Sequence, residues 1–110
     1  MKSSSYLRFL NAVKAIEGQS QLDAIQKKLL DKVMMEMSRE IDVLVGDLLA
    51  LKALGSQATL HGRIKKLSEE GYVDLVMDTV DNRKKIVTPT KLAIKYYEKL
   101  SSCLSQASYA

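Results

Sequence analysis

Six basic side chains stand in two short groups in the second half of the sequence, and their charge is the feature best suited to binding a partner. The groups are Arg63, Lys65 and Lys66, and Arg83, Lys84 and Lys85. Guanidinium and ammonium groups form charge-assisted hydrogen bonds with phosphate oxygens. The excess is local, because residues 56–110 hold nine basic and six acidic side chains, whereas residues 1–55 hold eight and seven. This pattern indicates a polyanionic partner. The alternative is that each basic run is only a solvated face.

The same sequence contains few residues or motifs that are typical of an active site. The chain has one histidine, His61, and one cysteine, Cys103, so it lacks a Cys/His cluster for a structural zinc. It contains no phosphate-binding loop and no Gly-x-Ser-x-Gly motif. We therefore expect a protein that is not an enzyme and that uses no metal or cofactor. His61 is expected to be an exposed side chain or a polar contact.

Length and the first residues narrow the class of protein further. With 110 residues, the chain is expected to form one domain, residues 1–110, around a single core. Lys2 is followed by three serines, and no apolar stretch approaches the roughly 18 residues of a membrane span. A lone cysteine forms no intramolecular disulfide and fits a reducing compartment. The sequence therefore predicts a cytoplasmic protein with no membrane segment.

The first basic group lies on a predicted helix-turn-helix. A helix is expected at 46–53, after which Gly55 suits a turn and Ser56 suits an N-cap. The next helix is expected over residues 57–70, and Gly71 is placed to end it as a C′ glycine. Two helices joined by a short turn define a helix-turn-helix.

The second basic group lies on a predicted β-hairpin. After Gly71 the hydrophobic period changes from near 3.6 to near 2, and β-rich segments occur at 72–77 and 85–88. Residues 78–84 between them are polar and turn-prone. Pro89 cannot donate to a strand ladder, so it should end the second strand.

Elements before this pair complete the predicted core. Apolar residues at helical spacing predict a helix over residues 5–17, which Gly18 is placed to end. Ser20 with Asp23 resembles a capping box that opens a second helix. The run at 41–45 is expected to be a short strand that leads into the helix-turn-helix.

A final helix is expected over residues 91–104, capped by Thr90, with residues 105–110 frayed. Its apolar side is predicted to hold Leu92, Ala93, Tyr96, Leu100 and Leu104, with Tyr97 and Cys103 flanking it. Tyr6, Phe9 and Leu10 add apolar surface on the first helix. Because one small domain does not need so much to cover itself, helices 5–17 and 91–104 are expected to form a homodimer with two-fold symmetry.

These elements define an α+β, mostly helical fold. It is a winged helix-turn-helix with a core at 20–90, a two-stranded β-hairpin as the wing, and flanking N- and C-terminal helices. The stretch from Ser56 to Val73, followed by Asp81, Asn82, Arg83, Val87 and Thr90, resembles the MarR-type winged helix-turn-helix transcription regulators.

Two motifs carry the resemblance, which covers about residues 40 to 94, and a third departs from the family pattern. Leu67 and Gly71 match a Leu-x-x-x-Gly pattern at the end of the recognition helix, and Asp81 and Arg83 match the Asp-x-Arg of a wing tip. Ala93 stands where the family has the glycine of Leu-Thr-x-x-Gly. The resemblance implies a transcriptional regulator that binds double-stranded DNA sequence-specifically, with its recognition helix in the major groove and its basic wing at the minor groove.

The recognition helix can also be analysed from its own residues. Leu60, Ile64 and Leu67 form a narrow apolar stripe that should pack inward. The residues expected to contact DNA are Ser56, Gln57, Thr59, His61, Gly62, Arg63, Lys65 and Lys66. Small residues admit a helix to a major groove about 12 Å wide, and the basic residues can reach phosphates at its edge. The alternatives are surface pairs of the lysines with Glu69 and Glu70, and a purely local role of Gln57 and Thr59 in the first turn.

The wing residues expected to contact DNA are Asn82, Arg83, Lys84 and Lys85, supported by Asp81. The resemblance implies that Arg83 enters the minor groove and that the two lysines contact phosphates. Asp81 can orient Arg83 or Lys85 by a charge-assisted hydrogen bond, although the same residues also suit a solvated turn. The alternative function is a winged-helix module that binds another protein and not DNA. Whether a small-molecule effector exists is unknown from the sequence.

Overall fold

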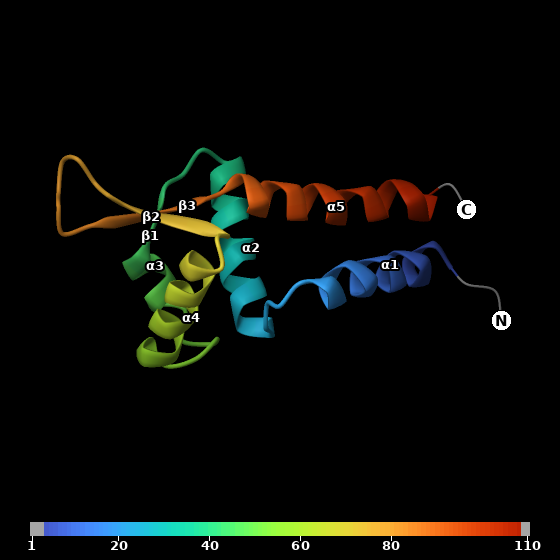
Figure 1. Cartoon of the computed structure of the whole chain (residues 1–110), viewed down its shortest axis with the longest axis horizontal. Coiled ribbons are helices and arrows are strands. Elements are labelled where there is room, and N and C mark those ends of the chain that lie inside the picture. Colours follow the sequence, from blue (N-terminus) through green and yellow to red (C-terminus); the bar gives the residue numbers. More distant parts are fainter. Residues whose placement is uncertain (1–3, 109–110) are drawn as a thin grey trace. The chain divides into compact units, whose positions relative to one another are not determined.

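The computed structural model describes residues 4–108 of the chain. Its elements in chain order are α1 (Ser5–Gln19), α2 (Ala24–Ser38), β1 (Val43–Leu44), α3 (Val45–Leu49), α4 (Gln57–Glu69), β2 (Val73–Met77), β3 (Lys85–Pro89) and α5 (Lys91–Ser108). They form two compact units (Figure 1): Asp23–Ala93 is the first, and segments 4–22 and 94–108 form the second. The helix-turn-helix, formed by α3 and α4, and the hairpin that follows confirm the predicted winged helix-turn-helix.

The predicted hairpin is part of a sheet with three strands. β3 pairs antiparallel with β2, from Lys85 opposite Met77 to its expected end at Pro89. Its other edge pairs with β1, where Val43 lies opposite Val87, so the strand order is β1-β3-β2. The predicted two-stranded hairpin and the predicted short strand are thus both present, but the pairing of β1 with β3 was not predicted, because β1 is only two residues long and its partner is remote in sequence.

The apolar stripe of α4 is buried as predicted. Leu60, Ile64 and Leu67 lie in the interior of the Asp23–Ala93 unit. There α4 packs against α2, α3 and β2. Burying one such side chain stabilises a fold by about 1.5–3 kcal/mol, so the three together fix which face of α4 remains outside. α3 is shorter than the predicted helix at 46–53, since it ends at Leu49.

Local signals set both ends of α4. The Ser56 Oγ accepts a hydrogen bond from the Thr59 N–H at 3.2 Å and so caps the helix as predicted. Gly71 follows the last turn with a φ of +85°, a left-handed conformation that disfavours residues with a Cβ. The chain then continues into β2, so the position of α4 also sets where the wing begins.

Thr90 ties the base of the wing to the end of α4. Its N–H donates to the Tyr72 carbonyl at 3.1 Å, and its hydroxyl donates to the Gly71 carbonyl at 2.6 Å. The same hydroxyl oxygen accepts from the Ala93 N–H at 3.3 Å, which caps α5 as expected. One residue therefore closes the hairpin and starts the last helix.

α1 ends later than predicted. It continues through Gly18 to Gln19. Ser20 then closes the last turn, because its N–H and its hydroxyl both donate to the Glu17 carbonyl. The helix thus ends at Ser20, whereas the sequence pattern had indicated that it would end at Gly18.

The capping box of α2 also differs from the prediction, which placed Ser20 at the N-cap. Asp23 is the N-cap: its Oδ1 accepts from the Gln26 N–H at 2.8 Å, and the Gln26 Oε1 accepts from the Asp23 N–H at 2.9 Å. This reciprocal pair satisfies two backbone donors at once. The box is therefore Asp23 with Gln26, three positions later than predicted.

α1 and α5 make up the second unit, to which α5 contributes from residue 94 onward. α5 remains helical to Ser108, so the expectation that the chain frays from residue 105 was wrong as far as residue 108. Residues 109–110 lie outside the described part. Arg8 of α1 donates from its Nη2 to the Ala107 carbonyl at 3.2 Å, a contact that the longer α5 makes possible.

The buried side of α5 is rotated relative to the predicted one. Cys103 and Ala107 are buried, whereas Leu104, which was predicted to lie on the apolar side, is 62% exposed. Leu92 was placed on that side too and is also exposed. The buried row of α5 consists of Ala93 and Tyr96, as predicted, with Cys103 and Ala107, and the two leucines lie outside it.

Gly71→Ala is expected to lower the free energy of unfolding by about 1–2 kcal/mol, because an L-residue is strained in the left-handed region. The added Cβ meets only Leu92 Cδ2, at 3.8 Å, so the loss comes from the backbone. Gly62→Ala is the control: its Cβ has nothing within 4 Å, and it should stabilise α4 by about 0.5–1 kcal/mol. Urea denaturation followed by circular dichroism measures both; a stable Gly71→Ala variant would contradict the assignment.

Candidate nucleic-acid interface

α4 presents a polar and basic face opposite its buried stripe. Exposed on it are Ser56, Gln57, His61, Gly62, Lys65 and Lys66, and half-buried at its border are Thr59 and Arg63. These are the eight residues that were predicted for this helix from the sequence. The face changes along its length from small polar side chains at the N-terminus to basic ones in the second half, as the sequence indicated.

Lys65 and Lys66 carry unpaired charges on this face. Neither forms an ion pair with any residue in 4–108, so the alternative pairing with Glu69 and Glu70 does not occur there. Glu70 accepts a hydrogen bond from Gln26 Nε2 at 2.8 Å instead. The two ammonium groups are therefore available to an external anion.

Gly62 lies exposed near the middle of the face. A Cβ built at this position would have nothing within 4 Å, so packing within the chain does not require a glycine here. Gly62 costs α4 about 1 kcal/mol relative to alanine. The bare backbone does leave room for a partner to approach the helix closely.

Arg63 turns toward the start of α2. Its Nε lies 2.6 Å from Asp23 Oδ2, with the two side chains 38% and 40% exposed. Partial burial acts to raise the pKa of Asp23, but the Gln26 N–H and the Arg63 guanidinium outweigh it and hold the pKa below its ordinary value. Asp23 was not predicted as a partner of the helix; its capping box with Gln26 was the available signal, and nothing local links it to Arg63.

At the wing tip Asp81 holds Arg83, as the sequence predicted. Asp81 Oδ1 accepts from the backbone N–H of Arg83 at 3.1 Å and from its Nε at 3.2 Å. The Arg83 side chain is 91% exposed, so the guanidinium is oriented yet open to solvent. Asn82, Lys84 and Lys85 lie beside it in the sequence, and all three are exposed.

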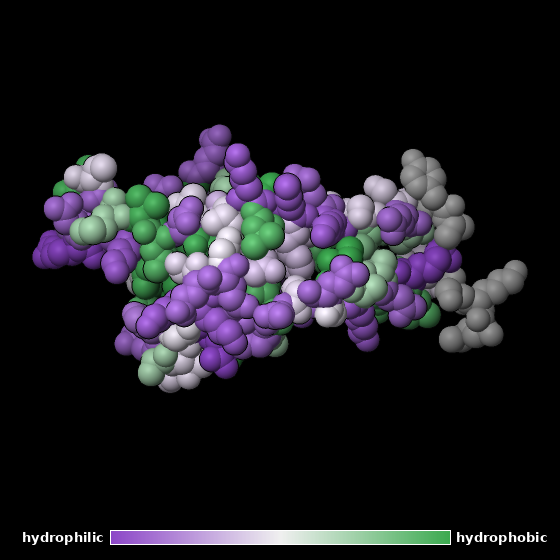
Figure 2. Space-filling view, in the orientation of Figure 1, coloured by the Kyte–Doolittle hydropathy of each residue, from purple (hydrophilic) through white to green (hydrophobic). Residues whose placement is uncertain are grey.

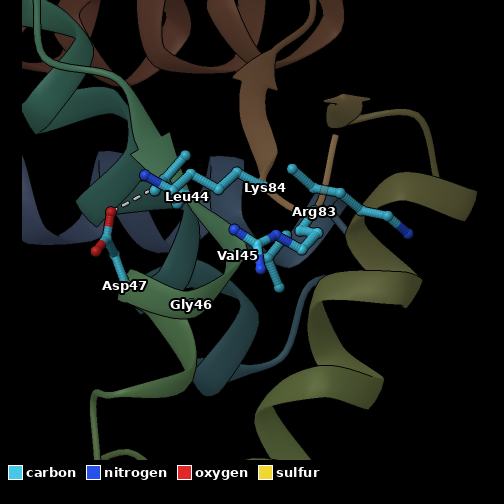
Figure 3. Close-up of a pocket in the computed structure, with 7 residues that line it drawn as sticks. Leu44, Val45, Gly46, Asp47, Arg83 and Lys84 are labelled. Atoms are coloured by element: carbon cyan, nitrogen blue, oxygen red, sulfur yellow. Dashed lines mark hydrogen bonds between the residues drawn. The ribbon is translucent and has the colours of Figure 1, made fainter. Parts of the chain in front are cut away.

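A hollow of about 300 Å³ lies where the wing meets the start of α3. It is lined by Leu44, Val45, Gly46, Asp47, Arg83, Lys84 and Lys85. Figure 3 shows the Arg83 and Lys84 side chains of the wing together with the Leu44–Asp47 turn, in which Asp47 Oδ2 accepts from the Leu44 N–H at 2.9 Å. The wing cations are exposed, and they line this hollow together with the start of the helix-turn-helix. No local pattern indicated this contact, since β1 was not predicted to join the sheet.

Hydrophilic side chains cover much of the surface over α4 and the loop between β2 and β3 in Figure 2. The apolar exceptions on the wing are Val76, Met77 and Val80, which are exposed. α4 packs against β2, and both lie in the Asp23–Ala93 unit. Both basic groups predicted from the sequence therefore lie on neighbouring elements.

Residues 4–108 contain no group of three or more His, Cys, Asp or Glu side chains that could hold a metal ion. No helix in that range is long and apolar enough to cross a membrane. His61 is exposed on α4.

Similar solved structures, and no sequence match, support the fold. No family model matches the sequence, and no curated protein matches it. Among solved structures, the transcriptional regulator Tm0710 from Thermotoga maritima is similar with a TM-score of 0.75 and 19% identity, over 92% of this chain and 67% of that one. At this identity the likeness concerns the fold.

Two further structures have the same fold. A mutant of S. aureus MepR bound to an oligodeoxyribonucleotide has a TM-score of 0.74 and 18% identity, over 99% of this chain and 81% of that one. BpsR of Bordetella bronchiseptica, whose DNA binding is regulated by 6-hydroxynicotinic acid, has a TM-score of 0.60 and 23% identity, over 96% and 71%. The predicted winged helix-turn-helix fold is thus confirmed.

Arg83→Gln is expected to raise the pKa of Asp81 toward its ordinary value, because the arginine bonds are the main cause that lowers it. The lowered pKa means that the ion pair orders the wing tip above the ordinary Asp pKa, and that this order is lost as the pH falls through the lowered value. An NMR titration of the Asp81 carboxyl carbon measures the shift. Lys85→Gln removes the same charge and serves as the control; identical Asp81 titrations in both variants would contradict the pairing.

Proposed function

We propose that the protein binds double-stranded DNA sequence-specifically and acts as a transcriptional regulator of the MarR type. α4 enters the major groove as the recognition helix, and the loop between β2 and β3 lies at the adjacent minor groove. The observation that carries the proposal is the outward face of α4. It is polar, has a bare backbone at Gly62 and carries two lysines without an ion-pair partner in residues 4–108.

Each part of that face suits a part of the groove. Ser56, Gln57, Thr59 and His61 lie in or just before the first turns of α4, where side chains reach base edges and backbone N–H groups attract a phosphate. Gly62 allows close approach, and Lys65 and Lys66 contact the phosphates that flank the groove.

The wing supplies the second contact. Arg83, which Asp81 orients, enters the minor groove, where the negative potential favours an arginine. Asn82, Lys84 and Lys85 contact the neighbouring sugar and phosphate groups. Because α4 packs on β2, the two contacts have a fixed spacing along the DNA.

Structures of the same fold support this assignment. One of them is a transcriptional regulator, and another, MepR, is bound to an oligodeoxyribonucleotide. A bacterial-type regulator binds chromosomal DNA, which lies in the cytoplasm, so we propose that the protein is cytoplasmic. It requires no enzyme activity for this function.

We also propose that the protein acts as a homodimer through α1 and α5. No residue of α1 is fully buried, although its sequence carries Phe9, Leu10, Val13 and Ile16 at helical spacing. Tyr6 and Leu104 are 66% and 62% exposed. A second copy that covers this surface would give two recognition helices related by a two-fold axis, which matches a palindromic DNA site.

Lys65→Gln and Arg83→Ala are each expected to weaken binding to duplex DNA and to lower the slope of log affinity against log salt by about one unit, because each removes one cation that releases a counterion from the DNA on binding. Fluorescence anisotropy at several salt concentrations measures the slope. Lys99→Gln, an exposed charge on α5, is the control and should leave it unchanged. Wild-type slopes in both test variants would refute the proposed contacts.

Leu104→Lys is expected to dissociate the dimer, because it places a charge in the apolar surface that the second copy covers. Sedimentation velocity at tens of micromolar would then give a monomer. Met35→Lys, at a residue of α2 that is 64% exposed, is the matched control and should remain dimeric. A wild-type protein that sediments as a monomer at that concentration would rule out this interface.

A further inference from the structure

Arg63 differs from the other cations of α4 in how it is held. Lys65 and Lys66 have no ion-pair partner in residues 4–108, whereas Arg63 has its Nε against Asp23 Oδ2 at 2.6 Å. Its Nε is shielded from solvent and makes no hydrogen bond of good geometry, so the guanidinium is held beside α2 by the ion pair with Asp23. Its charge is largely cancelled by the carboxylate beside it.

Asp23 uses both carboxylate oxygens in this arrangement. Oδ1 accepts from the Gln26 N–H at 2.8 Å and caps α2, while Oδ2 faces Arg63. A hydrogen bond on one oxygen and an ion pair on the other restrict the rotamer of this carboxylate. Asp23 therefore connects the first turn of α2 to the middle of α4.

A second contact joins the same two helix segments. Gln26 is completely buried, and its Nε2 donates to Glu70 at 2.8 Å. Arg63 and Glu70 are seven residues apart, so they lie on the same side of α4, two turns from each other. The first turn of α2 therefore contacts α4 at Arg63 and at its C-cap, Glu70. A single contact would leave the helix free to pivot, whereas two contacts set its direction.

We propose that Asp23 is a specificity-determining residue, which acts by holding Arg63 as a strut between α2 and α4 and by withdrawing its charge from DNA phosphates. The inference rests on the proposed function and assigns Arg63 a role other than the phosphate contact expected from the sequence. It follows from the direction of the guanidinium, from the neutralising carboxylate and from the second tie at Gln26.

The consequence for recognition concerns the ratio of specific to non-specific affinity. A free arginine beside the groove would bind phosphates of any sequence and raise non-specific affinity, which depends on counterion release. A strut fixes the angle at which α4 enters the groove, and the side chains of its first turns then meet the base edges. Asp23 thus favours the correct site over random DNA in two ways: it lowers non-specific affinity, and it fixes the direction of α4.

Asp23→Asn isolates this role. Asparagine caps a helix about as well as aspartate, so α2 should be retained, but its neutral amide cannot hold the guanidinium. Asp23→Ser, which also keeps a capping oxygen, replaces it if the first variant fails to fold. Arg63→Gln removes the strut from the other side. Lys65→Gln is the charge-matched comparison, because it loses one cation from the exposed face of the same helix.

The experiment is a salt titration of each variant by fluorescence anisotropy, on a duplex of random sequence and on a duplex selected by the wild-type protein. Arg63→Gln should leave the salt slope on random duplex unchanged, whereas Lys65→Gln lowers it by about one unit. Asp23→Asn should steepen it by about one unit because the released arginine reaches a phosphate. Both variants of the pair should lose about tenfold in the ratio of selected to random affinity, the effect of one misplaced base contact.

Two results would overturn the inference. Arg63→Gln could lower the slope as Lys65→Gln does, which would make Arg63 an ordinary phosphate contact. Alternatively, Asp23→Asn could leave both slope and ratio at wild-type values. Both results leave the proposed DNA binding intact, whereas a wild-type protein that binds neither duplex would overturn the proposed function and this inference together.

Discussion

Burial of Leu60, Ile64 and Leu67 attaches α4 to its unit in one rotation only, because no other face of the helix is apolar enough to replace that stripe. At about 1.5–3 kcal/mol for each side chain, turning the helix would cost much of the stability of a small domain. Every residue between the three then has its direction fixed. Gly62, Lys65 and Lys66 face outward as a consequence of where the apolar side chains go.

The position of the wing follows from that attachment. Gly71 reverses the chain at the end of α4, and Thr90 bonds to the carbonyls of Gly71 and Tyr72. The base of the hairpin is thereby held to the helix that precedes it. Its other edge is held by β1, and Asp81 sets the direction of Arg83 at the tip. Helix and wing therefore form one unit in which each basic group has a fixed place.

Much of this could be predicted from the sequence, because the signals are local. Ser56, Gly71 and Thr90 act at the ends of the elements they bound, and the Asp81–Arg83 bond spans two positions. What escaped prediction depends on contacts between distant segments. The pairing of Val43 with Val87, the contact of Asp23 with Arg63 and the bond from Gln26 to Glu70 each join elements far apart along the chain. The capping box was misplaced for a related reason: Ser20 and Asp23 both fit the pattern, and packing of Gln26 decided between them.

The outward face of α4 and the wing are proposed to read DNA as a two-fold pair. Selection from a pool of random duplex DNA by the purified chain tests this most directly. We expect enrichment of one sequence with inverted-repeat symmetry, whose half-sites lie about one helical turn apart. A pool that remains random after repeated rounds would contradict sequence-specific binding, and an enriched site without inverted symmetry would contradict the two-fold pair.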